Sequence, residues 1–224
     1  IAMAGVIGII RSSSIIKQAL GLAVSELGGK KKGEGAVERT QRDISMKFIL
    51  SGIISILIAT FVFFQFGVLG NLTHTIIATL IVFVISFLFT TVAANAIAIV
   101  GSNPVSGMTL MTLILSSLVL VSAGLSGTSG MMAAMIIGGV VCTALSMAGG
   151  FITDLKIGYW LGTTPARQEG WKFLGTAVSA ATIAGVMMVL NQTYGFVGEN
   201  ALVAPQANAM AAVIKPLMEG GATP

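Results

Sequence analysis

The chain has 224 residues, of which 55% are hydrophobic and only 9% are charged, and its formal net charge is +4. Because soluble domains carry about 25% charged residues, this composition excludes an ordinary soluble protein and predicts one that resides in lipid. With a single cysteine and a single histidine, the chain is also predicted to have no disulfide framework, no metal site and no cofactor.

The N-terminal segment precedes the long apolar part of the chain. Residues 1–10, IAMAGVIGII, are too few to cross a bilayer, which takes about 20 residues. We interpret them as the end of a truncated transmembrane helix in a fragment of a longer protein. Residues 11–47 are predicted to form a cytoplasmic amphipathic helix and then a basic loop, GGKKKGEG. This loop can be interpreted either as a segment that contacts lipid headgroups or as an ordinary solvated loop.

A long uncharged run follows, since no Asp, Glu, Lys or Arg occurs between Phe48 and Thr153. Each apolar stretch in it must be helical, because an open strand cannot satisfy its backbone in lipid. Glycine, asparagine and proline divide the run into four predicted transmembrane helices, at 48–68, 73–100, 104–123 and 131–152.

The rest of the chain is predicted to contain one more complete span. Residues 154–172 are expected to form a cytoplasmic loop and residues 173–190 a fifth transmembrane helix. Residues 191–224 are expected to hold an extracytoplasmic loop and the start of a short or re-entrant helix. The predicted fold is therefore all-α and polytopic, with about five complete transmembrane helices.

The positive charges predict the orientation. They flank the uncharged run on both sides, at 30–47 and at 156–172, while the turns within the run carry none. The excess of Lys and Arg in cytoplasmic loops therefore places both flanking segments in the cytoplasm, which requires an even number of spans between them. Cations beside a membrane span are no sign of a nucleic-acid partner.

A polar break, IVGSNPVSGMTL, separates the second and third predicted spans at residues 99–110. Ser102 or Asn103 followed by Pro104 is typical of a capped helix start. Broken helices in transporters also present backbone groups to a bound solute. The two interpretations are compatible, because a capped helix start can face a cavity.

Polar side chains continue into the spans on either side of the break. Hydroxyls at helical spacing form a stripe of Ser106, Thr109, Thr112 and Ser116. They either line a solute path or bond back to their own helix. Asn95 needs hydrogen-bond partners in a low-dielectric place, and we expect it to flank one cavity with Asn103.

Small residues recur at every fourth position of the fourth span, and they are Gly130, Ala134, Gly138, Cys142, Ser146 and Gly150. This pattern predicts close packing against another helix, with a backbone-lined solute path as the alternative. Ile137 is expected to lie on another face.

Four segments of the chain occur in the order and spacing of a known family. They are ERTQRDISMK at 38–47, GSNPVSGMT at 101–109, DLKIGY at 154–159 with GTTPARQ at 162–168, and APQANAMAA at 204–212. Together they resemble the oligopeptide transporter family, which includes the yellow-stripe-like metal-chelate transporters and their bacterial relatives.

The resemblance implies a secondary active transporter in a bacterial or archaeal cytoplasmic membrane. Its substrates would be small peptides or peptide-like metal chelates, which it would move together with protons. The protein would be in contact with membrane lipid. No oligomeric state is implied. The candidate residues of the substrate path, from the break and from the matching segments, are Asn95, Asn103, Pro104, Ser106, Thr109, Asp154, Tyr159 and Gln168.

The alternatives are a membrane channel, an integral membrane enzyme or a structural scaffold. An enzyme would need convergent acid, base or metal-binding residues, which the pattern does not contain, so we do not expect an enzyme. A channel would need a pore ring built by an oligomer. A scaffold would tolerate mutation of the break.

Overall fold

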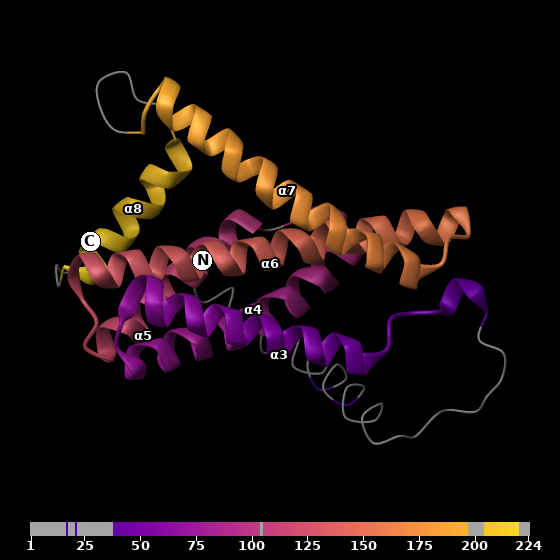
Figure 1. Cartoon of the computed structure of the whole chain (residues 1–224), viewed down its shortest axis with the longest axis horizontal. Helices are drawn as coiled ribbons and strands as arrows, with labels where there is room; N and C mark the ends of the chain where they lie inside the picture. Colours follow the sequence, from indigo (N-terminus) through magenta and orange to yellow (C-terminus); the bar gives the residue numbers. More distant parts are fainter. Residues whose placement is uncertain (1–16, 18–20, 22–37, 104, 197–203, 220–224) are drawn as a thin grey trace. The chain divides into compact units, whose positions relative to one another are not determined.

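The computed structural model describes residues 17, 21, 38–103, 105–196 and 204–219, with the exception of the Ser106 side chain. Every regular element in these residues is helical (Figure 1). The elements are η1 (Arg39–Gln41), α3 (Met46–Phe63), the π-helix η2 (Phe64–Leu69), α4 (Leu72–Val100), α5 (Val105–Ser122), α6 (Gly127–Leu161), α7 (Pro165–Thr193) and α8 (Pro205–Met218).

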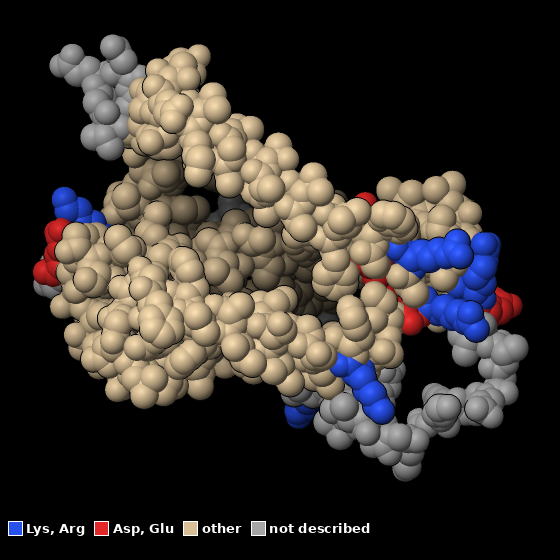
Figure 2. Space-filling view, in the orientation of Figure 1, with Lys and Arg blue, Asp and Glu red and all other residues tan. Residues whose placement is uncertain are grey.

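The helices confirm an all-α polytopic membrane protein. Among the described residues, four helical stretches are long and apolar enough to cross a membrane, and Gly107–Ser122 is a shorter apolar helix. Figure 2 shows long helical surfaces on which few charged side chains appear. The four long stretches are Arg39–Leu69, Leu72–Val100, Gly127–Leu161 and Pro165–Thr193.

The chain divides into two compact units, which we describe separately. Unit 1 comprises Ile1–Glu34, Ser45–Asp154 and Met210–Pro224, and unit 2 comprises Gly35–Ile44 and Leu155–Ala209. Unit 1 therefore holds α3, η2, α4, α5 and most of α6, whereas unit 2 holds η1, the end of α6 and α7.

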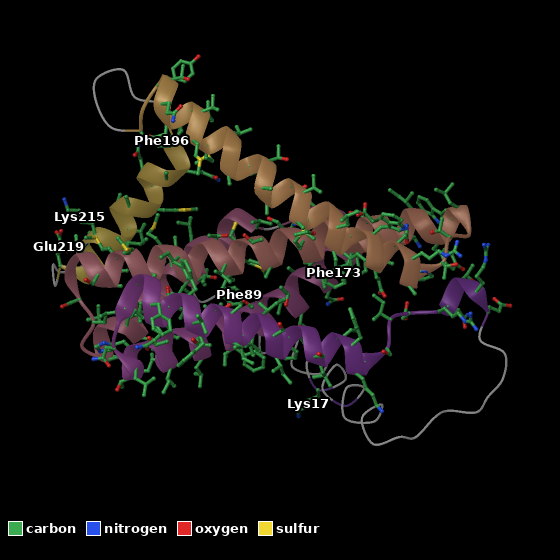
Figure 3. The ribbon with its side chains drawn as sticks, viewed as in Figure 1. Lys17, Phe89, Phe173, Phe196, Lys215 and Glu219 are labelled. Atoms are coloured by element: carbon green, nitrogen blue, oxygen red, sulfur yellow. The ribbon has the colours of Figure 1, made fainter. Side chains whose placement is uncertain are left out.

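The core of unit 1 is formed by α4, α5 and α6. Phe89 of α4, labelled in Figure 3, Leu113 of α5 and Ile137 of α6 are all buried. By contrast, α3 contains no buried residue. An apolar helix surface of this kind can face lipid without cost, because lipid tails are as apolar as the side chains.

The ends of α4 follow from local sequence. Its first turn is capped by Asn71, whose side chain accepts a hydrogen bond from the Thr73 amide at 3.0 Å. Its last turn is closed by Gly101, which has a φ of +75° and donates its amide to the Ile97 carbonyl at 2.8 Å. Glycine takes this left-handed conformation at no steric cost.

The buried face of α6 does not follow the predicted stripe along its whole length. Gly130, Ala134 and Gly138 are buried as expected, but Ser146 is exposed. A step of four residues exceeds one helical turn of 3.6 residues, so a stripe with that spacing winds off the buried face. Ile137, expected on another face, is also fully buried, so the face of α6 beside Gly138 is packed as well.

The α6–α7 region differs from the loop expected at 154–172. Helix α6 continues to Leu161 and α7 begins at Pro165, so only residues 162–164 lie outside a helix. Charged residues mark the end of the apolar run, but they do not end a helix. The helix ends at Gly162, which has a φ of +69°, and proline is well suited to the first helical position of α7.

The predicted terminal segments lie partly outside the described residues. This holds for the truncated helix at 1–10 and, apart from Lys17 and Gly21, for the amphipathic helix and basic loop. Within 191–224, where a short helix was expected, α8 occupies Pro205–Met218. Its last turns pack in unit 1, where a Cβ added at Gly130 of α6 would lie 3.1 Å from the Met218 sulfur.

Candidate functional site

The break between α4 and α5 places the Asn103 side chain directly against α6. Gly149 of α6 is buried, and a Cβ added there would overlap the amide nitrogen of Asn103 and lie 3.0 Å from Cδ1 of Ile97. Because real Cβ atoms do not approach other atoms this closely, only glycine leaves room for the Asn103 amide at this point of α6.

The rest of the Asn103 side chain is accessible. The residue is exposed, and its amide forms no hydrogen bond within the part of the chain that the structure describes. Within the described residues no capping hydrogen bond from Ser102 or Asn103 is found, and Pro104 lies outside those residues. The Asn103 amide is therefore held at α6 by packing, while its own hydrogen-bonding groups are available.

An open groove of about 500 Å³ lies in unit 1 between α4 and α6. Asn95 is half-buried in it, and the described residues give its amide no hydrogen-bond partner. The hydroxyls of Thr90 and Thr91 instead donate to carbonyls of their own helix. The groove is lined by Thr90, Thr91, Ala94, Asn95, Ala148, Phe151 and Ile152.

The two asparagines meet α6 at consecutive residues. Asn95 shares the groove with Ala148, whereas Asn103 packs on Gly149. Asn103 is not among the residues that line this groove, so a cavity shared by Asn95 and Asn103 stays a prediction. The structure brings two unengaged amides to the same turn of α6.

Three hydroxyl residues of the α5 stripe, Thr109, Thr112 and Ser116, are buried in unit 1, whereas the Ser106 side chain lies outside the described part of the chain. Thr109 is 4% exposed and donates to the Val105 carbonyl at 2.7 Å, and Thr112 donates to the Met108 carbonyl at 2.9 Å. Of the two interpretations, the structure therefore shows hydroxyls that bond back to their own helix. Thr109 lies in the core and not on an accessible path.

The remaining candidates lie at the end of α6 and the start of α7. Asp154 and Tyr159 are exposed, and the Lys156 ammonium lies 5.7 Å from the centre of the Tyr159 ring. Gln168 is half-buried and packs on Gly158, where an added Cβ would overlap its amide. In unit 2 a glycine of α6, Gly158, thus also packs directly against an amide side chain.

Residues that the sequence analysis did not single out fasten the segment before α3 to the α6–α7 turn. Within unit 2, Arg39 donates from Nη2 to the Gly162 carbonyl at 2.8 Å, and the Ala166 amide donates to the Arg42 carbonyl at 2.9 Å. The Ile44 amide donates to Oε2 of Glu169 at 2.9 Å. We call these three hydrogen bonds the clasp.

The clasp escaped detection because it joins residues far apart in sequence. Arg39 and Gly162 are separated by 123 positions, and Ile44 and Glu169 by 125. Both segments carry the family resemblance, which was the one available signal, but no spacing rule pairs them.

The described residues show no set of ligands for a metal ion. No group of three or more His, Cys, Asp or Glu side chains lies close enough together in those ranges. The side chains of Asn95 and Asn103 are neutral amides, which act as both hydrogen-bond donors and acceptors.

Long apolar helices joined by short turns, with polar groups at a helix break inside them, define a polytopic integral membrane protein. A family model described as OPT oligopeptide transporter protein matches residues 1–224. The chain belongs to the oligopeptide transporter family.

A relative in Haemophilus influenzae (strain ATCC 51907 / DSM 11121 / KW20 / Rd) carries the name "Putative oligopeptide transporter". It is 30% identical over 160 residues, which cover 62% of this chain and 25% of the relative. The chain thus spans about a quarter of the length of that relative. No solved structure matches the chain.

Proposed function

We propose that this chain is part of a secondary active transporter that moves small peptides or peptide-like metal chelates, coupled to protons. Family membership and the name of the bacterial relative support the peptide substrate. We place the protein in a bacterial or archaeal cytoplasmic membrane.

The observation that carries the proposal is the groove beside Asn95. Its volume of about 500 Å³ lies in the range of about 300–1,000 Å³ that is typical of small-molecule sites. A peptide bond that leaves water needs a donor and an acceptor to replace its hydration, and a carboxamide supplies both. The half-buried Asn95 amide therefore matches a peptide group better than it matches an ion.

Uptake by the full-length protein in proteoliposomes tests this role. With a panel of peptides and their metal chelates, we expect Asn95→Leu to raise the apparent KM up to about tenfold, because one hydrogen bond contributes about 0.5–1.5 kcal/mol net. Thr91→Val is the matched control, since the Thr91 hydroxyl already bonds to its own helix. An unchanged KM in Asn95→Leu would contradict the proposal.

The same vesicles separate a carrier from the alternatives. A carrier preloaded with unlabelled peptide accelerates the entry of labelled peptide by counterflow, whereas a channel does not. Peptide uptake that ignores an imposed proton gradient would remove the proton coupling but leave peptide transport in place.

The orientation proposal rests on the charges and is supported by the clasp. Residues 39–44 contact residues 162–169 within unit 2, which supports placing both segments on one side of the membrane, and the excess of cations favours the cytoplasm. Thr128 lies at the opposite end of α6.

Single cysteines can check this orientation in a Cys142→Ala background, since Cys142 is the one cysteine of the chain. We expect cysteines at Gln41 and Thr164 to react only with reagents that reach the cytoplasm, and a cysteine at Thr128 to react from outside. Labelling of Gln41 and Thr164 from opposite sides would overturn the proposed orientation.

A further inference from the structure

We infer that Gly149 is a positioning residue that seats the Asn103 amide as a contact for the peptide backbone of the substrate. The inference rests on the proposed function and concerns a residue outside the Asn95 groove. It assigns a role to Gly149, which has no side chain that could bind the substrate directly.

The first step is the close approach. A Cβ at Gly149 would overlap the Asn103 amide nitrogen and lie 2.7 Å from its Cγ. The overlap involves the functional end of the side chain, so a methyl group at this position would displace the amide itself. Cδ1 of Ile97 would lie 3.0 Å from the same Cβ, so the space over Gly149 is bounded on that side too.

The second step concerns what the seated amide can bind. Asn103 is exposed, and the described residues provide no hydrogen bond for its side chain. The NH₂ end of the amide is the part that packs over Gly149, and the carbonyl oxygen is the acceptor that remains for the N–H group of a solute. A fixed amide loses less conformational entropy on binding than a mobile one.

The third step concerns the class of ligand. No Asp, Glu, Lys or Arg occurs between Phe48 and Thr153, so this part of the chain offers a peptide neutral hydrogen bonds and no charge. Neutral amides pair with peptide groups and do not select the charged termini. Mutations at this contact should therefore change the apparent KM for peptides with blocked termini by the same factor as for peptides with free termini.

The test compares variants of the full-length protein in proteoliposomes. Gly149→Ala should raise the apparent KM for a transported peptide up to about tenfold, the effect of one lost hydrogen bond, with a smaller change in kcat. Asn103→Ala should act similarly, and the double variant should be no worse than either single variant, because both remove the same contact. N-acetylated, C-amidated peptides should show the same ratios.

Gly139→Ala is the matched control, since Gly139 lies in the same helix, is exposed, and has open space where its Cβ would be. Alanine is the better helix former, so neither glycine variant should lose helical structure. A parental KM in Gly149→Ala, or independent effects that multiply in the double variant, would overturn the inference while the proposed function stands. If the parent takes up no peptide, both fail together.

Discussion

Replacing Gly138 by leucine should lower the free energy of unfolding by about 1–3 kcal/mol, the usual cost of overpacking a core. Gly138 is buried in α6, and a Cβ there would overlap Cδ2 of Leu113 in α5 and lie 3.0 Å from its Cγ. The larger leucine side chain must therefore displace the buried Leu113 side chain from its packing or adopt a strained rotamer itself. Thermal or denaturant-induced unfolding of the purified protein measures this difference.

Gly139→Leu is the control for this prediction. Gly139 is exposed and nothing lies within 4 Å of its added Cβ, while the gain in helix propensity is the same at both positions. The difference between the two variants therefore reports packing alone. Ile137 cannot serve as the control, because it is fully buried. Equal losses of stability at Gly138 and Gly139 would contradict close packing of α5 on α6.

Glu169→Ala should release the segment that precedes α3. The carboxylate accepts the Ile44 amide at 2.9 Å in a part-buried place, and hydrogen bonds to charged groups contribute about 1.5–3 kcal/mol. We expect amide exchange at Ile44 to become about tenfold faster, an estimate at the lower end of that range because solvent screens the site. Hydrogen exchange followed by mass spectrometry of the segment 39–47 measures this.

Two further variants test the specificity of this effect. Glu169→Gln keeps an oxygen acceptor but loses the charge, so its exchange rate should fall between those of the parent and Glu169→Ala. Glu38→Ala removes an exposed carboxylate from the same segment and should leave exchange at Ile44 unchanged. If Glu38→Ala and Glu169→Ala accelerate exchange equally, the exchange rate at Ile44 depends on the net charge of the region and not on the hydrogen bonds of the clasp.

The first three spans could be predicted within a few residues because local chemistry sets their ends. The predicted ranges 48–68, 73–100 and 104–123 correspond to α3 with η2, α4 and α5. In each case an apolar run stops at glycine, asparagine or proline, which end helices through their own backbone preferences. The fourth helix, α6, extends beyond the predicted span 131–152, because charges at the end of an apolar run mark the expected limit of lipid and not the end of the helix.

The candidate site could be predicted only in part. Asn95 was found from the cost of a polar amide in lipid and Asn103 from the helix break, and both lie at α6 without a partner among the described residues. Thr109 stays a candidate whose hydroxyl bonds to its own helix, because helical spacing shows that hydroxyls share a face but not where they donate. The contact between Gly149 and Asn103 could not be predicted, since a glycine that makes room for a side chain far away in sequence produces no periodic pattern.

The clasp also has a consequence for the order in which the protein assembles. The ribosome adds residues at about 5–20 per second, so the 125 positions between Ile44 and Glu169 take about 6–25 seconds to synthesise. During that time water must satisfy the Ile44 amide, while α3, α4 and α5 can already insert and pair. Unit 2 therefore closes late, as a long-range contact made after the intervening helices, and an early stop in translation would leave the segment before α3 unfastened.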